Sequence, residues 1–193
     1  MALPFPTDNF FPLSGRCSCA TISYQITAFP LITHICYCTW CQRESGSVCG
    51  LNTLIESSYF KLTASTKPEL ISGPTPSGNG QTNARCPLCH DTLFKYYGAN
   101  RHMTYVKAGT LDRDSFQRVM EGERVHIYAG SKPEWVGLEG ERKRGVGVFE
   151  EYYVREEVWR KEALERREGL MERVTREKKI EGSEDGDGDG ARE

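Results

Sequence analysis

The eight cysteines of this chain are the residues whose type and spacing are best suited to chemistry. Zinc holds thiolates in a tetrahedron at roughly 2.3 Å, so its ligands must converge within a few ångströms. A Cys-x-x-Cys turn can aim two sulfurs at one ion, and so can Cys-x-Cys on an extended strand, because residues two apart share a face. The cysteines fall into an early pair (Cys17 and Cys19), a central trio (Cys36, Cys38 and Cys41) and a late pair (Cys86 and Cys89), beside the lone Cys49. This spacing predicts zinc as the cofactor.

The expected cellular setting favours metal ligands over disulfides. Residues 1–6 lack the basic and apolar stretches of a secretory signal. No segment approaches the roughly 18 apolar residues of a membrane span, so we expect a soluble cytoplasmic protein without a membrane partner. In a reducing compartment, clustered cysteines are interpreted as metal ligands before disulfides. The formal net charge of −2 gives no electrostatic reason to expect nucleic acid as a partner.

Two groupings of the cysteines fit the spacing. In the first, Cys38 and Cys41 join the late pair in a four-cysteine zinc ribbon, which leaves Cys36 and the early pair without a role. In the second, the early and late pairs share one ion and close a long loop, while the central trio holds another ion with three protein ligands. Spacing alone does not decide between the two, although the second uses seven cysteines rather than four.

The second grouping would give the central trio a chemistry of its own. Zinc with four protein ligands is closed and serves folding, whereas zinc with three keeps a position for water or substrate. Three thiolates leave such a centre with a net charge of about −1, which weakens it as a Lewis acid but suits the binding of an incoming thiol as thiolate. We therefore predict thiolate activation, followed by attack on a carbonyl carbon. The alternative is a second structural zinc whose fourth ligand is Cys49 or a histidine.

The segments that must position these cysteines have the pattern of short β-strands. Ile22, Tyr24 and Ile26 alternate with polar residues, which is the period of a half-buried strand. Further strand candidates lie at 32–38, 48–54, 59–62, 92–97 and 103–108, with a turn at 39–41 and a loop at 72–83. Many short strands separated by Gly and Pro predict a mainly β, compact, zinc-bridged fold with little helix.

The two ends of the chain differ in composition from its middle. Residues 1–14 are rich in proline and predict an extended arm before a zinc domain at 15–140. Over 141–181, acidic residues precede basic ones at i, i+4 spacing without a continuous apolar stripe, which predicts a charged, solvated C-terminal helix. The Asp-Gly repeats in 182–193 predict a disordered acidic tail.

Several motifs carry a resemblance to a known family. They begin with Gly15-Arg-Cys17-Ser-Cys19, continue with Cys36-Tyr-Cys38-Thr-Trp-Cys41 and end with Cys86-Pro-Leu-Cys89. The stretches 108–112, 126–128 and 132–135 follow. In this order they resemble the glutathione-dependent formaldehyde-activating enzyme family, which includes centromere protein V-like proteins. The resemblance covers residues 10–140 and leaves the charged helix outside.

The resemblance implies a β fold built of zinc-bridged sheets and the second grouping of cysteines. The early and late pairs would hold a structural zinc and the central trio a catalytic zinc, giving two zinc ions per chain. The implied activity is that of a carbon–sulfur lyase of the S-hydroxymethylglutathione synthase type, which joins glutathione to formaldehyde. The implied partner is a small-molecule substrate, a glutathione-type thiol or a small electrophilic metabolite.

Two functions follow from these observations. The first is a zinc enzyme, in which Arg43 is our candidate for binding an anionic substrate such as glutathione, because a guanidinium pairs well with carboxylates. The second is a non-catalytic zinc-binding interaction module, with the charged helix as its docking element. The open coordination position expected at the central trio favours the enzyme.

Overall fold

The computed structural model describes residues 10–184, with side chains up to residue 180. The predicted arm at 1–14 and the predicted tail at 182–193 therefore lie largely outside the described residues. Leu13, within the predicted arm, pairs with Ile26 in a sheet. The last residues of that arm therefore belong to the folded body.

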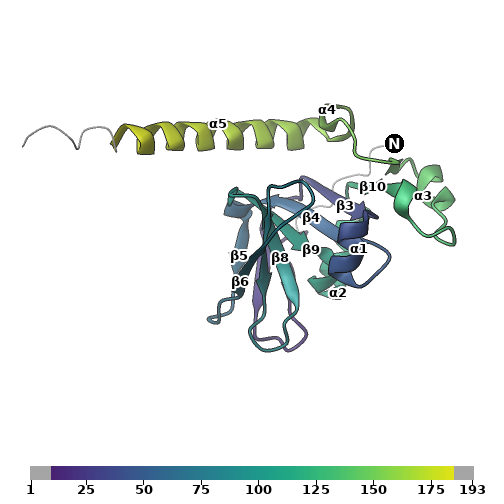
Figure 1. Cartoon of the computed structure of the whole chain (residues 1–193), viewed down its shortest axis with the longest axis horizontal. Helices are drawn as coiled ribbons and strands as arrows, with labels where there is room; N and C mark the ends of the chain where they lie inside the picture. The colour runs from purple at the N-terminus through teal and green to yellow at the C-terminus, as the bar shows by residue number, and fades with distance from the viewer. Residues whose placement is uncertain (1–9, 185–193) are drawn as a thin grey trace, which may run out of the picture.

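Two β-sheets form that body (Figure 1). The smaller sheet has the order β1-β2-β5, and the larger has the order β11-β10-β3-β4-β9-β8-β7-β6. In the larger sheet, β10 runs parallel to β3 and to β11. The neighbours in the remaining series β3-β4-β9-β8-β7-β6 all pair antiparallel. The strands are β1 (Leu13–Arg16), β2 (Ser23–Ile26), β3 (Ile32–Cys36), β4 (Gly50–Glu56), β5 (Phe60–Leu62), β6 (Glu69–Gly73), β7 (Gln81–Arg85), β8 (Thr92–Tyr97), β9 (Met103–Lys107), β10 (Arg124–Ile127) and β11 (Gly147–Val148). The mainly β character predicted from the sequence is confirmed.

The smaller sheet packs on one face of the larger one. Ile22, Tyr24 and Ile26 are at most 1% exposed, which confirms the alternation that predicted a half-buried strand. They share a hydrophobic cluster with Phe94 and Val106 of the larger sheet. The early and late pairs border this cluster, so the core between the sheets supports them.

Helices cover the opposite face of the larger sheet. Leu54 and Val125 of this face share a cluster with Ala163, Leu170 and Val174 of α5 (Lys161–Glu184). Those three α5 residues are 4–7% exposed and recur at helical spacing, so the helix has a buried stripe. The prediction of a solvated helix without an apolar stripe is therefore wrong for this face of α5. Figure 1 shows α5 lying along this side of the sheets and extending beyond them.

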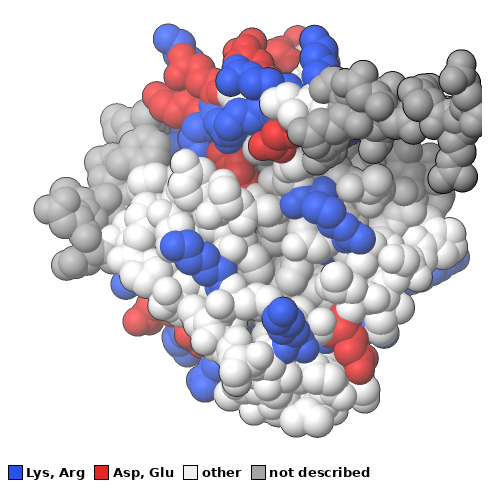
Figure 2. All heavy atoms as spheres, turned by 90° about the vertical axis from the view of Figure 1, so that its left-hand side faces the viewer, with Lys and Arg blue, Asp and Glu red and all other residues white. Residues whose placement is uncertain are grey.

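The remaining surface of α5 is charged. Figure 2 shows Lys, Arg, Asp and Glu side chains crowded at the top of the molecule, where α5 lies, above a face that is mostly uncharged. This agrees with the acidic and basic pairs noted in the sequence. No described helix is both long enough and apolar enough to cross a membrane.

The chain holds more helix than the sequence pattern indicated. Residues 39–41, predicted as a turn, begin α1 (Thr39–Ser45), and Gly46 caps its C-terminus in the left-handed conformation (φ 61°). The predicted helix at 141–181 is interrupted by β11, where Val146, Val148 and Phe149 favour an extended chain that pairs with β10. The other helices are α1 (Thr39–Ser45), η1 (Ser57–Tyr59), η2 (Ala108–Thr110), α2 (Arg113–Glu121), η3 (Ala129–Ser131), α3 (Glu139–Lys143) and α4 (Arg155–Val158).

Candidate metal centres

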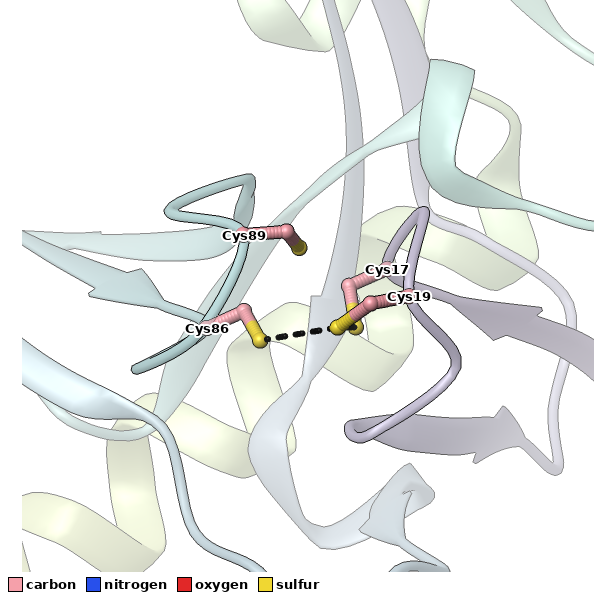
Figure 3. A group of neighbouring side chains, drawn as sticks. All are labelled: Cys17, Cys19, Cys86 and Cys89. Carbon is pink, nitrogen blue, oxygen red and sulfur yellow. Dashed lines mark hydrogen bonds between the residues drawn. The ribbon is translucent and has the colours of Figure 1, made fainter.

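The early and late pairs meet in one group, the four-cysteine cluster. Figure 3 shows their side chains pointing toward one another, the early pair from the turn after β1 and the late pair from the turn after β7. The Sγ atoms of Cys17 and Cys19 lie 3.5 Å apart, and those of Cys19 and Cys86 lie 3.6 Å apart. All four Sγ atoms lie within 4.8 Å of one another. Tetrahedral zinc would separate its sulfur ligands by roughly 3.8 Å, so this donor set fits zinc.

Hydrogen bonds fix each of the two turns, and the carboxylate of Asp91 joins one turn to the other. The Ile22 N–H donates to Cys17 Sγ at 3.3 Å, and the Cys86 N–H donates to the Asp91 carbonyl at 2.9 Å. The Asp91 carboxylate accepts both the backbone N–H and the hydroxyl of Ser18 at 2.6 Å, which lowers the pKa of Asp91. Sequence reasoning missed Asp91, since its partner lies 73 residues away.

The central trio forms a second cluster where β3 leads into α1. Cys36 ends β3, Cys38 is the N-cap of α1 and Cys41 lies in its first turn, with all three Sγ atoms within 4.8 Å of one another. The Cys41 N–H donates to Cys38 Sγ at 3.4 Å. Cys36 and Cys41 are 5% and 3% exposed, whereas Cys38 is partly exposed. The cluster therefore reaches the surface through Cys38.

No further Cys, His, Asp or Glu among the described residues joins the central trio. Cys49 lies outside it, and His34 shares a hydrogen bond of 2.6 Å with the Tyr153 hydroxyl instead. The cysteines are thus gathered as in the second grouping and not as in the zinc ribbon of the first. That each of them binds zinc in its expected role stays a prediction.

The three thiols of the central trio interact strongly with one another. Hydrogen bonds from Cys36 and then Cys41 lower the pKa of Cys38 to about 2, while the hydrogen bond to Cys38 raises the pKa of Cys36. These hydrogen bonds favour the thiolate form of Cys38, the one partly exposed cysteine of the trio. The thiolate is the form of cysteine that binds a metal.

Next to the central trio, buried charges join α1 to the larger sheet in what we call the Glu44 cluster (Glu44, Lys95 and Lys107). The Glu44 carboxylate accepts from Lys95 Nζ at 2.7 Å and from Lys107 Nζ at 2.8 Å. The Lys95 side chain is fully buried, and those of Glu44 and Lys107 are 9% and 13% exposed. Both lysines lie within electrostatic range of Cys41. The cluster therefore places one net positive charge beside the trio.

The contact between α1 and β4 decides which residues of α1 face the sheet. A Cβ at Gly50 would lie 3.1 Å from Cys41 Cβ and 3.3 Å from its Sγ, so glycine allows this close approach. Glu44, three residues after Cys41, faces the same way, whereas Arg43 is exposed. The i, i+3 spacing from Cys41 was the signal that could have identified Glu44, which sequence reasoning missed.

Comparisons with known proteins identify the family of this chain. The model of the glutathione-dependent formaldehyde-activating enzyme family matches residues 12–131, more than half of the 193 residues. The chain belongs to this family. No curated protein matches the chain. A crystal structure of a Rhodobacter sphaeroides protein is similar at 13% identity, covering 71% of this chain and 99% of that one with a TM-score of 0.39.

The match to the family domain covers both cysteine clusters and stops before the segment that contains α3. Within that segment, Glu141 of α3 accepts from Arg124 at 2.8 Å, which with the neighbouring His126 lowers the pKa of Glu141 to about 2. His126 Nδ1 in turn lies 3.0 Å from the Tyr37 hydroxyl. Tyr37 lies between Cys36 and Cys38 in the sequence, so a hydrogen-bonded series runs from Glu141, outside the family match, through His126 to a residue next to two of the trio.

Proposed function

We propose that this protein is a zinc-dependent enzyme of the carbon–sulfur lyase type that activates a glutathione-type thiol at the central trio. The observation that carries the proposal is a cluster of three cysteines, one of them partly exposed, which no further Cys, His, Asp or Glu of the described residues completes. Membership of the family supports a reaction between a thiol and formaldehyde. In that reaction the sulfur forms a bond to the carbonyl carbon, and the thiol proton ends on the carbonyl oxygen.

The residues divide into two groups by role. Cys36, Cys38 and Cys41 would hold a zinc that binds the substrate sulfur as a thiolate, and the four-cysteine cluster would hold a second, structural zinc. The partly exposed Cys38 marks the side from which substrate enters. Arg43, exposed on α1, stays our candidate for a contact with an anionic part of the substrate.

An exchange experiment tests this function. We expect the native chain with zinc to accelerate exchange between ¹³C-formaldehyde and its glutathione adduct, measured by NMR. The Cys38→Ser variant should slow the catalysed exchange by about 100-fold or more, because a metal centre that binds a reactant contributes several kcal/mol to the barrier. Cys49→Ser, outside the cluster, should keep the native rate. Equal rates for Cys38→Ser and the native chain would refute the assignment.

A second candidate is a non-catalytic zinc-binding interaction module. It is favoured by α5, which extends beyond the sheets with a charged surface (Figures 1 and 2). A native chain that holds zinc at both clusters but gives no thiol-dependent exchange would favour this module over the enzyme.

A further inference from the structure

The four-cysteine cluster reaches the surface of the molecule at one of its members. Cys17 and Cys86 are buried, at 2% and 0% exposed, and Cys89 is partly exposed, whereas Cys19 is exposed. The Cys19 thiol donates to the hydroxyl of Thr21, which belongs to the same turn. Reaction of a cysteine with a small reagent follows its exposure as well as its thiolate character. A reagent in the solvent can therefore meet this cluster first at the Cys19 sulfur.

A second sulfur from a distant part of the chain faces Cys19. Cys86 Sγ lies 3.6 Å from Cys19 Sγ, and Figure 3 shows the two side chains pointing toward each other from separate turns. A short movement of these side chains would bring the sulfurs to bonding distance. Cys17 Sγ is as near, at 3.5 Å, but a bond between Cys17 and Cys19 would close a small ring around a single residue. Such a ring strains the geometry of a disulfide, so Cys86 is the better partner.

Hydrogen bonds between protein atoms keep the two turns facing each other. The Asp91 carboxylate accepts the backbone N–H and the hydroxyl of Ser18, each at 2.6 Å, and Ser18 directly precedes Cys19. The Cys86 N–H donates to the Asp91 carbonyl at 2.9 Å. Asp91 thus contacts both turns, and none of these bonds needs a metal ion. Cys19 and Cys86 therefore stay opposite each other when the cluster changes its occupant.

The central trio lies in a different part of the core. Cys17 and Cys86 belong to the hydrophobic cluster between the two sheets, whereas Cys36 and Cys41 belong to the cluster that α5 covers. The two cysteine groups share no member. A covalent change in the four-cysteine cluster can therefore leave the trio as it is.

We propose that Cys19 and Cys86 form an oxidation site for a small peroxide, at which a disulfide replaces zinc as the link between the two turns. Oxidation would thus release the structural zinc without separating the turns. The site is independent of thiol activation at the trio, because its chemistry uses only the early and late pairs.

The reaction takes place in two steps, written here for the free thiols. The Cys19 sulfur attacks one oxygen of hydrogen peroxide, the O–O bond breaks and an S–O bond forms, which gives a sulfenic acid and one water. The Cys86 sulfur then attacks the Cys19 sulfur, so that an S–S bond forms, the S–O bond breaks and a second water leaves with the Cys86 proton. The two thiols lose the electron pair that the peroxide gains. Cys17 and Cys89 alone are too few ligands to hold zinc.

Mapping of the disulfide in the zinc-loaded full chain tests this site. The chain is treated with hydrogen peroxide, its free thiols are blocked, and its peptides are analysed by mass spectrometry, while elemental mass spectrometry measures the zinc that remains. We expect a linked pair of peptides that contain Cys19 and Cys86, and the loss of one zinc ion per chain with the circular dichroism retained. Dithiothreitol with added zinc should restore the starting mass and zinc content.

Two variants serve as controls. Cys49→Ser removes the cysteine outside both clusters and should give the same linked peptides and the same loss of zinc. Asp91→Ala removes the carboxylate that joins the turns, so its Cys19 sulfur should meet Cys86 less often and be oxidised further, to the sulfinic acid. We therefore expect less disulfide and more sulfinic acid in Asp91→Ala than in the native chain.

Oxidation confined to the central trio, with the early and late pairs still reduced, would overturn the proposal. So would a disulfide between Cys17 and Cys19 in place of the one between Cys19 and Cys86. An Asp91→Ala variant that forms the disulfide as completely as the native chain would overturn the role given to this carboxylate. Every readout is a peptide mass or a zinc content, so a chain that fails the formaldehyde exchange experiment still tests the oxidation site.

Discussion

Replacing Glu44 with alanine is expected to lower the free energy of unfolding by about 3–5 kcal/mol, measured by urea denaturation at a fixed zinc concentration. The carboxylate accepts hydrogen bonds from the fully buried Lys95 and from Lys107, at 2.7 and 2.8 Å. Its removal leaves two neighbouring ammonium groups buried without a counter-charge, which is among the most unfavourable single changes a protein can undergo. Direct repulsion between the two lysines adds to the loss.

A double variant tests whether electrostatics causes the loss of stability in Glu44→Ala. In Glu44→Ala/Lys95→Met one of the two stranded charges is gone, so we expect a smaller loss of stability than in Glu44→Ala alone. Glu172→Ala, on the exposed surface of α5, should change the free energy of unfolding by less than about 0.5 kcal/mol. A Glu44→Ala variant as stable as Glu172→Ala would show that the Glu44 cluster does not hold α1 to the sheet.

The same cluster predicts a pH dependence. Burial alone would raise the pKa of Glu44, but the charges of Lys95 and Lys107 outweigh burial and hold it below its ordinary value. The native carboxylate thus binds its proton at lower pH than the unfolded one does. Its contribution to stability is present above the ordinary carboxyl range and is lost as the pH falls through the native pKa. The native chain and the Glu44→Ala variant should therefore differ in free energy of unfolding by a nearly constant amount from pH 7 downward. This difference should become smaller only as the pH approaches 4.

The Arg166→Ala variant is expected to lose about 3 kcal/mol and to loosen α5 from the sheets. Arg166 Nε and Nη2 donate to the Glu56 carboxylate at 2.9 and 2.5 Å, and Nη1 donates to the Phe29 carbonyl at 2.7 Å. Because Glu56 is 1% exposed, the variant leaves its carboxylate buried without its cation. Hydrogen exchange should become faster in α4 and α5, while the central strands stay protected.

Arg173→Ala is the matched control, since it removes an exposed arginine of the same helix. It should leave both stability and the exchange of α5 near the native values. If Arg166→Ala behaved like this control, the ion pair would not be what fastens the C-terminal extension to the family domain.

Local patterns predicted the strands next to the cysteines but not the helix α1, which carries Cys41. The alternation of Ile22, Tyr24 and Ile26 is the period of a strand with one buried face, and those three side chains are buried. The clusters themselves could be grouped from the sequence only through the family resemblance, because Cys-x-Cys and Cys-x-x-Cys spacing fits two partitions equally well. The structure brings the early pair to the late pair and leaves the central trio apart.

Long-range contacts account for what the sequence did not predict. Glu44 meets Lys95 and Lys107 across 51 and 63 residues, so no local pattern could identify these two lysines as its partners. Arg43 was chosen for its chemistry and lies exposed, one position from the residue that faces the sheet. The C-terminal helix was expected to be solvated because its charges dominate its composition, yet Ala163, Leu170 and Val174 bury one stripe against the sheet.

The electrostatics of the trio and of the Glu44 cluster are complementary. Three thiolates with one zinc ion would carry a charge of about −1, and two lysines with one glutamate carry +1. The charges offset each other in a partly buried place, which favours the fully deprotonated trio that zinc requires. With zinc bound at the trio, the Glu44 cluster of this chain would offset the charge of the three thiolates.

Zinc content per chain is the most direct test that the central trio is a separate metal centre. Elemental mass spectrometry of the freshly purified chain should give two zinc ions, and Cys36→Ser/Cys38→Ser should give one with its circular dichroism unchanged. The remaining ion would then be the one at the four-cysteine cluster, which closes the fold. A native chain that holds a single zinc ion after zinc has been added, and that keeps it in the variant, would contradict the account.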